Sequence, residues 1–167
     1  MTMKLLPDEI SRQMSKIYNN MRDYRGNCVD RRVCKGMCCL QNLSMSYVEF
    51  AYLADYLMQN FPEEKAREIL TRDKTPFIAQ NGKLRHFCSI HEGADCLGYP
   101  ARPFRCRSYI MDEKRDCRPL GELEMDHKSW RRIWRLDSSI VPPGILEKEN
   151  CIKENYINFW VREVLKD

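Results

Sequence analysis

The chain lacks several features that would assign it to a large class of proteins. No stretch approaches the roughly 18 consecutive apolar residues that a membrane-spanning helix requires, so we expect no membrane span. Internal repeats, low-complexity tracts and linkers are also missing. The start, MTMKLLPDEI, has no apolar segment of the kind found in a secretory signal. We therefore expect one domain over residues 1–167, located in the cytoplasm.

Familiar catalytic motifs are missing as well. The sequence has no glycine-rich phosphate loop, no serine–histidine–acid order and no HExxH element. The carboxylates between residues 112 and 124 are scattered along a charged segment, so none receives an acid–base role. The net charge of +4 is too small to indicate nucleic-acid binding by itself. The sequence thus assigns no catalytic residue and does not decide whether the protein is an enzyme.

Cysteine, in contrast, is abundant, with nine residues in 167. Thiolates that lie this close together either pair as disulfides or bind a soft metal. A reduced compartment and an odd number of cysteines favour the metal. Six cysteines form two groups and are the predicted metal ligands: Cys34, Cys38 and Cys39 in the first, and Cys88, Cys96 and Cys106 in the second.

The spacing of these cysteines bears on which metal they bind. Structural zinc sites usually contain C-x2-C pairs, and this chain has none. Iron–sulfur clusters accept less regular spacing and are larger, so neighbouring thiolates are easier to use. Cys38 and Cys39 are adjacent, and because successive side chains diverge we do not expect both to bind the same ion. One of them would then serve a second site or remain a free thiol. We predict an iron–sulfur cluster, of the 4Fe-4S type, with zinc as the alternative.

Other candidate ligands are weaker. His86 and His91 flank Cys88 and carry imidazoles suited to zinc, but a histidine beside such a group more often hydrogen-bonds the site or faces water. Cys151 stands next to an isoleucine and is expected in the core. For Cys28 and Cys117 the sequence does not decide between a core residue and a metal ligand.

The second cysteine group carries a family resemblance. Cys38-Cys39, Cys88, Cys96-Leu-Gly-Tyr99 and Arg102-Pro-Phe-Arg-Cys106-Arg107 resemble motifs of the CxxCxxCC zinc- or iron-chelating family, the YkgJ-like cysteine-cluster proteins. The resemblance covers roughly residues 28 to 110, and the cysteines before Cys38 are spaced more widely than the family pattern. It implies metal binding by the clustered cysteines. One branch resembles flagellin lysine methylases, which are associated with an iron–sulfur cluster, and this implies a role in protein modification.

The hydrophobic pattern predicts a mainly α fold. Helical spacing indicates helices over residues 7–24, from a Ser46/Glu49 capping box to residue 60, from Pro62 to about residue 73, around residues 130–134 and through residues 152–164. Asn81-Gly82 indicates a tight turn with one short hairpin arm over residues 83–90. Irregular cysteine-rich loops are expected around the metal site.

Arginine is concentrated in two places. One group surrounds the last clustered cysteines and can either bind an anionic partner or donate hydrogen bonds to cluster sulfurs and loop carbonyls: Arg102, Arg105, Arg107, Arg115 and Arg118. The other lies in KSWRRIWR, residues 128–135, where tryptophans and arginines alternate. A buried aromatic stripe on an amphipathic helix is favoured there over a surface for nucleic acid or a membrane.

These observations predict a metalloprotein that acts in redox chemistry or in the cluster-dependent modification of a protein partner. A nucleic-acid partner is not favoured. The alternatives are a zinc-stabilised binding module and a metal-handling protein without catalysis.

Overall fold

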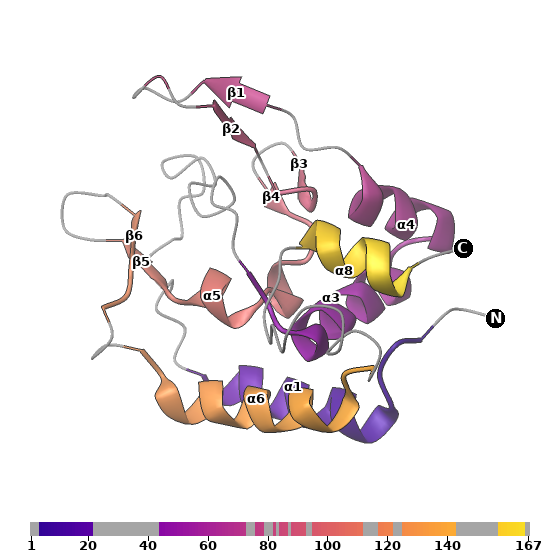
Figure 1. Cartoon of the computed structure of the whole chain (residues 1–167), viewed down its shortest axis with the longest axis vertical. Coiled ribbons are helices and arrows are strands. Elements are labelled where there is room, and N and C mark those ends of the chain that lie inside the picture. Colours follow the sequence, from indigo (N-terminus) through magenta and orange to yellow (C-terminus); the bar gives the residue numbers. More distant parts are fainter. Residues whose placement is uncertain are drawn as a thin grey trace.

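The structure is a computed structural model that describes residues 4–21, 44–72, 76–78, 82, 84–86, 88–92, 95–111, 117–121, 125–142 and 157–165. In this part the chain is mainly helical (Figure 1), which confirms the predicted class. The longer helices are α1 (Asp8–Asn20), α3 (Tyr47–Asn60), α4 (Glu63–Thr71), α6 (His127–Ile140) and α8 (Ile157–Val164).

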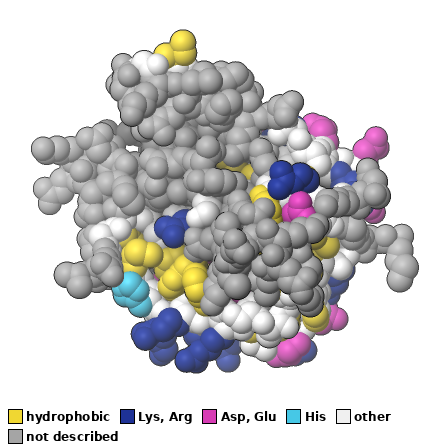
Figure 2. Space-filling model, in the orientation of Figure 1, with side chains coloured by type: hydrophobic (Ala, Val, Ile, Leu, Met, Phe, Trp, Pro, Cys, Tyr) yellow, Lys and Arg dark blue, Asp and Glu magenta, His cyan; other side chains and the backbone are white. Residues whose placement is uncertain are grey.

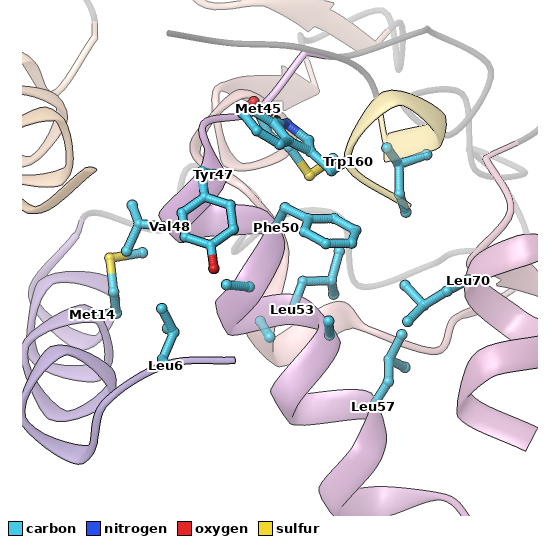
Figure 3. Packing of buried hydrophobic residues seen from close by; sticks show 14 of the residues in the cluster. Leu6, Met14, Met45, Tyr47, Val48, Phe50, Leu53, Leu57, Leu70 and Trp160 are labelled. Carbon is cyan, nitrogen blue, oxygen red and sulfur yellow. Dashed lines mark hydrogen bonds between the residues drawn. The ribbon is translucent and has the colours of Figure 1, made fainter. Parts of the chain in front are cut away.

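Helix α3 lies at the centre of the fold and contacts α1, α4, α6 and α8. Its N-terminus is the predicted capping box, in which Ser46 and Glu49 satisfy each other's backbone N–H groups. The predicted stripe on this helix is fully buried and includes Phe50, Leu53 and Leu57 (Figure 3). The core of the described residues is therefore built around α3.

Helices α1 and α6 lie side by side, and both contact α3 (Figure 1). From α1, Met14, Ile17 and Tyr18 are buried as their spacing predicted. From α6, Ile133 is fully buried and Trp130 packs on Phe104 with 4.9 Å between ring centroids. The interpretation of residues 128–135 as an amphipathic helix is confirmed, with Ile133 buried and Trp130 packed against the core. The predicted aromatic stripe is only partly buried, because Trp130 and Trp134 are both half-buried.

Helices α4 and α8 contact each other and α3. Pro62 stands at the N-cap of α4, one residue before the first turn, and the helix ends at Thr71, slightly before its predicted end. Trp160 of α8 packs on Tyr47 and Phe50, and its indole N–H donates to the carbonyl of Met45 at 2.9 Å. The earlier part of the predicted last helix, residues 152–156, lies outside the described residues.

Two buried carboxylates fasten distant segments to these helices. Asp55 of α3 accepts the backbone N–H groups of Leu5 and Leu6, at 2.7 and 2.9 Å. Asp137 of α6 accepts the N–H of Val48 in the first turn of α3, at 2.8 Å. Because the first N–H groups of a helix have no partner within it, this contact joins α6 to the end of α3 as an external cap.

Three two-stranded antiparallel hairpins complete the described structure. The first pairs β1 (Pro76–Ile78) with β2 (Leu84–His86), and Gly82 between them has the positive φ of 73° that favours glycine. It confirms the predicted hairpin. The other two were not predicted, because strands of two or three residues show no period: β3 (His91–Glu92) with β4 (Asp95–Cys96), and β5 (Tyr109–Met111) with β6 (Cys117–Pro119).

Among the described residues, no helix has both the length and the apolar character that crossing a membrane would require.

Candidate metal site

The structure describes half of the predicted ligands. Cys88, Cys96 and Cys106 are all half-buried, so each is partly accessible. Cys34, Cys38 and Cys39 lie outside the described residues, as do Cys28 and Cys151, and for Cys117 only the backbone, in β6, is described. Among the described residues no three Cys, His, Asp or Glu side chains form a group able to hold a metal ion. The six-cysteine site therefore stays a prediction.

Cys88 begins a tight turn that leads into the β3–β4 hairpin. Its carbonyl accepts the N–H of His91 at 3.0 Å. His91 then stands opposite Cys96 in the antiparallel register. Cys88 and Cys96 both pack against the hydrophobic core, and this packing fixes the position of the turn and of the β3–β4 hairpin.

Arg72, at the C-cap of α4, braces this turn from the other side. Its guanidinium donates to the carbonyl of Ser89 and, at 3.2 Å, to the carbonyl of His91. It also approaches the carboxylate of Glu92 at 3.5 Å, although Glu92 is half-exposed and such an ion pair contributes little. Arg72 lies outside both cysteine groups, so the sequence does not indicate its part in this site.

Cys96 is followed by a glycine that the packing requires. A Cβ atom built on Gly98 would lie 2.4 Å from a terminal methyl of Leu53 and 3.3 Å from a methyl of Ile90. Leu53 is fully buried in α3 and cannot easily move aside. The glycine in Cys96-Leu-Gly-Tyr99 thus lets this segment lie directly on α3.

The next turn, η2 (Tyr99–Ala101), leads into the one-turn helix α5 (Phe104–Arg107), which carries Cys106. Two buried arginines tie these turns together. Arg102 lies 3.7 Å above the Tyr99 ring and donates to the Tyr99 carbonyl at 2.9 Å. Arg107 donates to the carbonyls of Arg102 and Pro100, at 2.9 and 2.6 Å.

These contacts bear on the two interpretations of the arginine group. Arg102 is 3% exposed and Arg107 8%, and both donate to loop carbonyls. For these two the structural role is confirmed. Arg105 is exposed, Arg115 lies outside the described residues, and only the backbone of Arg118 is described.

Glu49 connects this segment to the helical core. One of its carboxylate oxygens accepts the N–H of Phe104 at 2.6 Å and the hydroxyl of Tyr18 at 3.2 Å. The other accepts the N–H and the hydroxyl of Ser46, at 3.0 and 3.1 Å. The side chain is 1% exposed, so these bonds are made away from water. A residue predicted only as a helix cap therefore also positions the turn that bears Cys106.

Tyr18 lies at the centre of this arrangement. Burial, together with the neighbouring Glu49 carboxylate, raises the pKa of Tyr18 well above its ordinary value. The Arg107 guanidinium, 4.2 Å above the ring, opposes this increase, and the charge of Cys106 adds to it.

We expect this tyrosine to make the fold sensitive to alkali. A phenol whose pKa is raised by folding stabilises the folded state below the unfolded pKa, about 10, and this contribution is lost as the pH rises towards the folded pKa. Above pH 10 the wild type should lose up to about 1.4 kcal/mol of unfolding free energy per pH unit relative to Tyr18→Phe. Urea unfolding of both proteins at neutral pH and at about pH 11 measures the difference, and an unchanged difference would contradict a buried, neutral Tyr18.

Comparison of the chain with protein families, with curated proteins and with solved structures finds no match. The chemistry of the site is therefore interpreted from its own residues. The three half-buried thiols lie in a turn, in β4 and in the one-turn helix α5. Arg72 contacts the turn that Cys88 begins, and Arg102 and Arg107 hold the segment that leads to Cys106. These guanidinium groups donate to backbone carbonyls, and the thiolate is the form in which the cysteines would bind a metal.

Proposed function

We propose that the protein holds an iron–sulfur cluster through its clustered cysteines and acts in redox chemistry or in the modification of a protein partner. The observation that carries the proposal is the clustering of Cys34, Cys38 and Cys39 and of Cys88, Cys96 and Cys106 in the sequence. All three described cysteines are half-buried. Cys88 lies in a turn that Arg72 of the α4 C-cap contacts, Cys96 lies in β4, and Cys106 lies in α5, whose first residue donates to Glu49 of α3.

The environment of Ser89 fits a sulfur-rich group beside Cys88. The Ser89 side chain is 3% exposed, and among the described residues its hydroxyl has no hydrogen-bond partner. Leaving a buried hydroxyl unsatisfied costs about 1–3 kcal/mol, so an acceptor is expected near it. A thiolate or a cluster sulfide would accept this hydrogen bond, and such bonds tune the electronic properties of metal sites.

The cluster would supply one-electron chemistry when bound, and the chain would supply its ligands and the shell around them. Cys88, Cys96 and Cys106 are the described residues that would hold it, together with Cys34, Cys38 and Cys39. The arginine-braced turns would fix the ligand positions, and partial exposure of the thiols would leave the site close to a docking protein. We place the protein in the reducing cytoplasm and among the YkgJ-like cysteine-cluster proteins.

Zinc is the second candidate, because thiolates also bind it in structural sites that staple loops together. The two metals are separated by purifying the protein without oxygen and measuring iron, zinc and acid-labile sulfide per chain, with the visible spectrum. The proposal predicts a brown protein with iron and sulfide in near-equal amounts. Zinc without sulfide, in a colourless protein that unfolds with strong chelators, would overturn it in favour of a zinc-stabilised binding module.

A further inference from the structure

The outer surface of α6 carries a row of positive charges. Lys128, Arg131 and Arg135 are exposed and Arg132 is half-buried; we call these four residues the basic face of α6. Figure 2 shows Lys and Arg side chains gathered at the edge of the molecule that α6 forms. Trp130 and Ile133, on the opposite side of the helix, face the core. The charges are therefore displayed on a helix whose orientation is fixed by packing.

The acidic residues of this helix do not neutralise the basic face. Asp126 is the N-cap and accepts the N–H and hydroxyl of Ser129, at 3.0 and 2.8 Å. Asp137 is 4% exposed and accepts the N–H of Val48. Among the described residues, no carboxylate forms an ion pair with any member of the basic face.

Other helices of the same protein show a different pattern. In α1, Arg12 pairs with Glu9 at 2.8 Å. In α4, Lys65 pairs with Glu68 at 2.8 Å, one turn along the helix. These helices balance their surface charges internally, whereas α6 accumulates charge of one sign.

This accumulation does not help α6 to form. Like charges three or four residues apart repel, at a cost of a few tenths of a kcal/mol per pair. Lys128 also stands in the first turn, where the helix dipole is positive and disfavours a cation. Arg131 donates to the His127 carbonyl at 3.2 Å, but among the described residues no carboxylate offsets the repulsion within the basic face, so a binding role accounts for it better than a structural one.

The geometry of the basic face favours one kind of partner. Lys128 and Arg132 are one turn apart, as are Arg131 and Arg135, so each pair is spaced by about 6 Å along the axis. Carboxylates four residues apart on an acidic helix have the same spacing, and arginine binds carboxylates through two parallel hydrogen bonds. We propose that the basic face of α6 docks a carboxylate-rich segment of a partner protein.

Nucleic acid fits this face less well. Proteins that bind single strands combine positive charge with aromatic rings on which bases stack. On α6 the tryptophan rings are already engaged, since Trp130 packs on Phe104 and lies 5.4 Å from the ring of Trp134. The basic face also spans only two turns of one helix, a short footprint for a phosphate backbone. An acidic protein segment therefore remains the favoured occupant.

The test compares two variants that lose the same positive charge. Lys128→Gln/Arg131→Gln/Arg135→Gln changes only exposed members of the basic face. Arg12→Gln/Lys16→Gln/Lys65→Gln removes three cations from α1 and α4 and is the matched control. The probe is a labelled helical peptide of about 18 residues, roughly five turns, with paired glutamates on one face. Its binding is measured by fluorescence anisotropy at low and high salt, beside an oligouridylate of about ten nucleotides.

We expect the wild type to bind the peptide in a salt-sensitive manner, the α6 variant to bind it about tenfold more weakly, and the control to change less than twofold. Equal weakening of both variants, absence of peptide binding, or tighter binding of the oligouridylate would each overturn the proposal. The proposal identifies a partner class for the proposed function but does not depend on the metal. Iron and sulfide content, measured in both variants, should equal that of the wild type, so failure of docking and failure of metal binding are separable.

Discussion

Replacement of Glu49 by alanine is expected to lower the free energy of unfolding by about 4 kcal/mol. The carboxylate is 1% exposed and accepts hydrogen bonds from Ser46, Phe104 and Tyr18. Hydrogen bonds to a charged group contribute about 1.5–3 kcal/mol each, and removing the acceptor leaves buried backbone N–H groups unsatisfied. Because these bonds join α3 to α1 and to the Cys106 turn, one substitution loosens three parts of the fold.

Urea unfolding measures this effect, with Glu64→Ala as the control. Glu64 is exposed on α4, and its loss should change stability by no more than about 0.5 kcal/mol. Glu49→Gln keeps the volume but turns one acceptor into a donor that faces other donors, so it should also destabilise, by about 2 kcal/mol. Wild-type stability in Glu49→Ala would mean that Glu49 does not join these segments.

The second large effect is expected on metal content. Serine at position 88, 96 or 106 removes a soft sulfur ligand while keeping nearly the same volume, and its hydroxyl is a poor ligand for iron in a cluster. Each of Cys88→Ser, Cys96→Ser and Cys106→Ser should lose most of its iron and acid-labile sulfide. The measurement is made on anaerobically purified proteins, with protein concentration from amino-acid analysis.

Cys151→Ser provides the matched control, since Cys151 is expected to be a core residue and not a ligand. It should retain the wild-type iron and sulfide content. Full metal content in both Cys96→Ser and Cys106→Ser would show that the second cysteine group does not bind the cluster. Equal loss in Cys151→Ser would mean that the assay reports stability and not ligation.

The parts of the fold that depend on local pattern were predictable from the sequence. Ser46 and Glu49 have the spacing of a capping box, and the structure contains one. The apolar stripes of α1 and α3 follow the helical period and are buried. Asn81-Gly82 marks the β1–β2 hairpin, because glycine tolerates the positive φ found at Gly82. In each case the signal lies within a few residues.

What the sequence did not reveal depends on contacts between distant residues. The bond between Glu49 and the N–H of Phe104 joins positions 55 residues apart, and nothing near either position indicates it. Arg72 braces the Cys88 turn from the end of another helix. Gly98 is required by the Leu53 side chain, which no local pattern shows. Such contacts decide where the cysteine-bearing segments lie. The candidate ligand residues could therefore be named from the sequence, but their arrangement in space could not.

X-ray absorption at the iron and zinc edges of the anaerobically purified protein would show whether cysteine thiolates hold an iron–sulfur cluster. The expected result is iron surrounded by sulfur with a second iron nearby, the pattern of a cluster held by thiolates. A zinc edge without iron, or iron surrounded by nitrogen and oxygen with no second iron, would mean that the cysteines hold no iron–sulfur cluster.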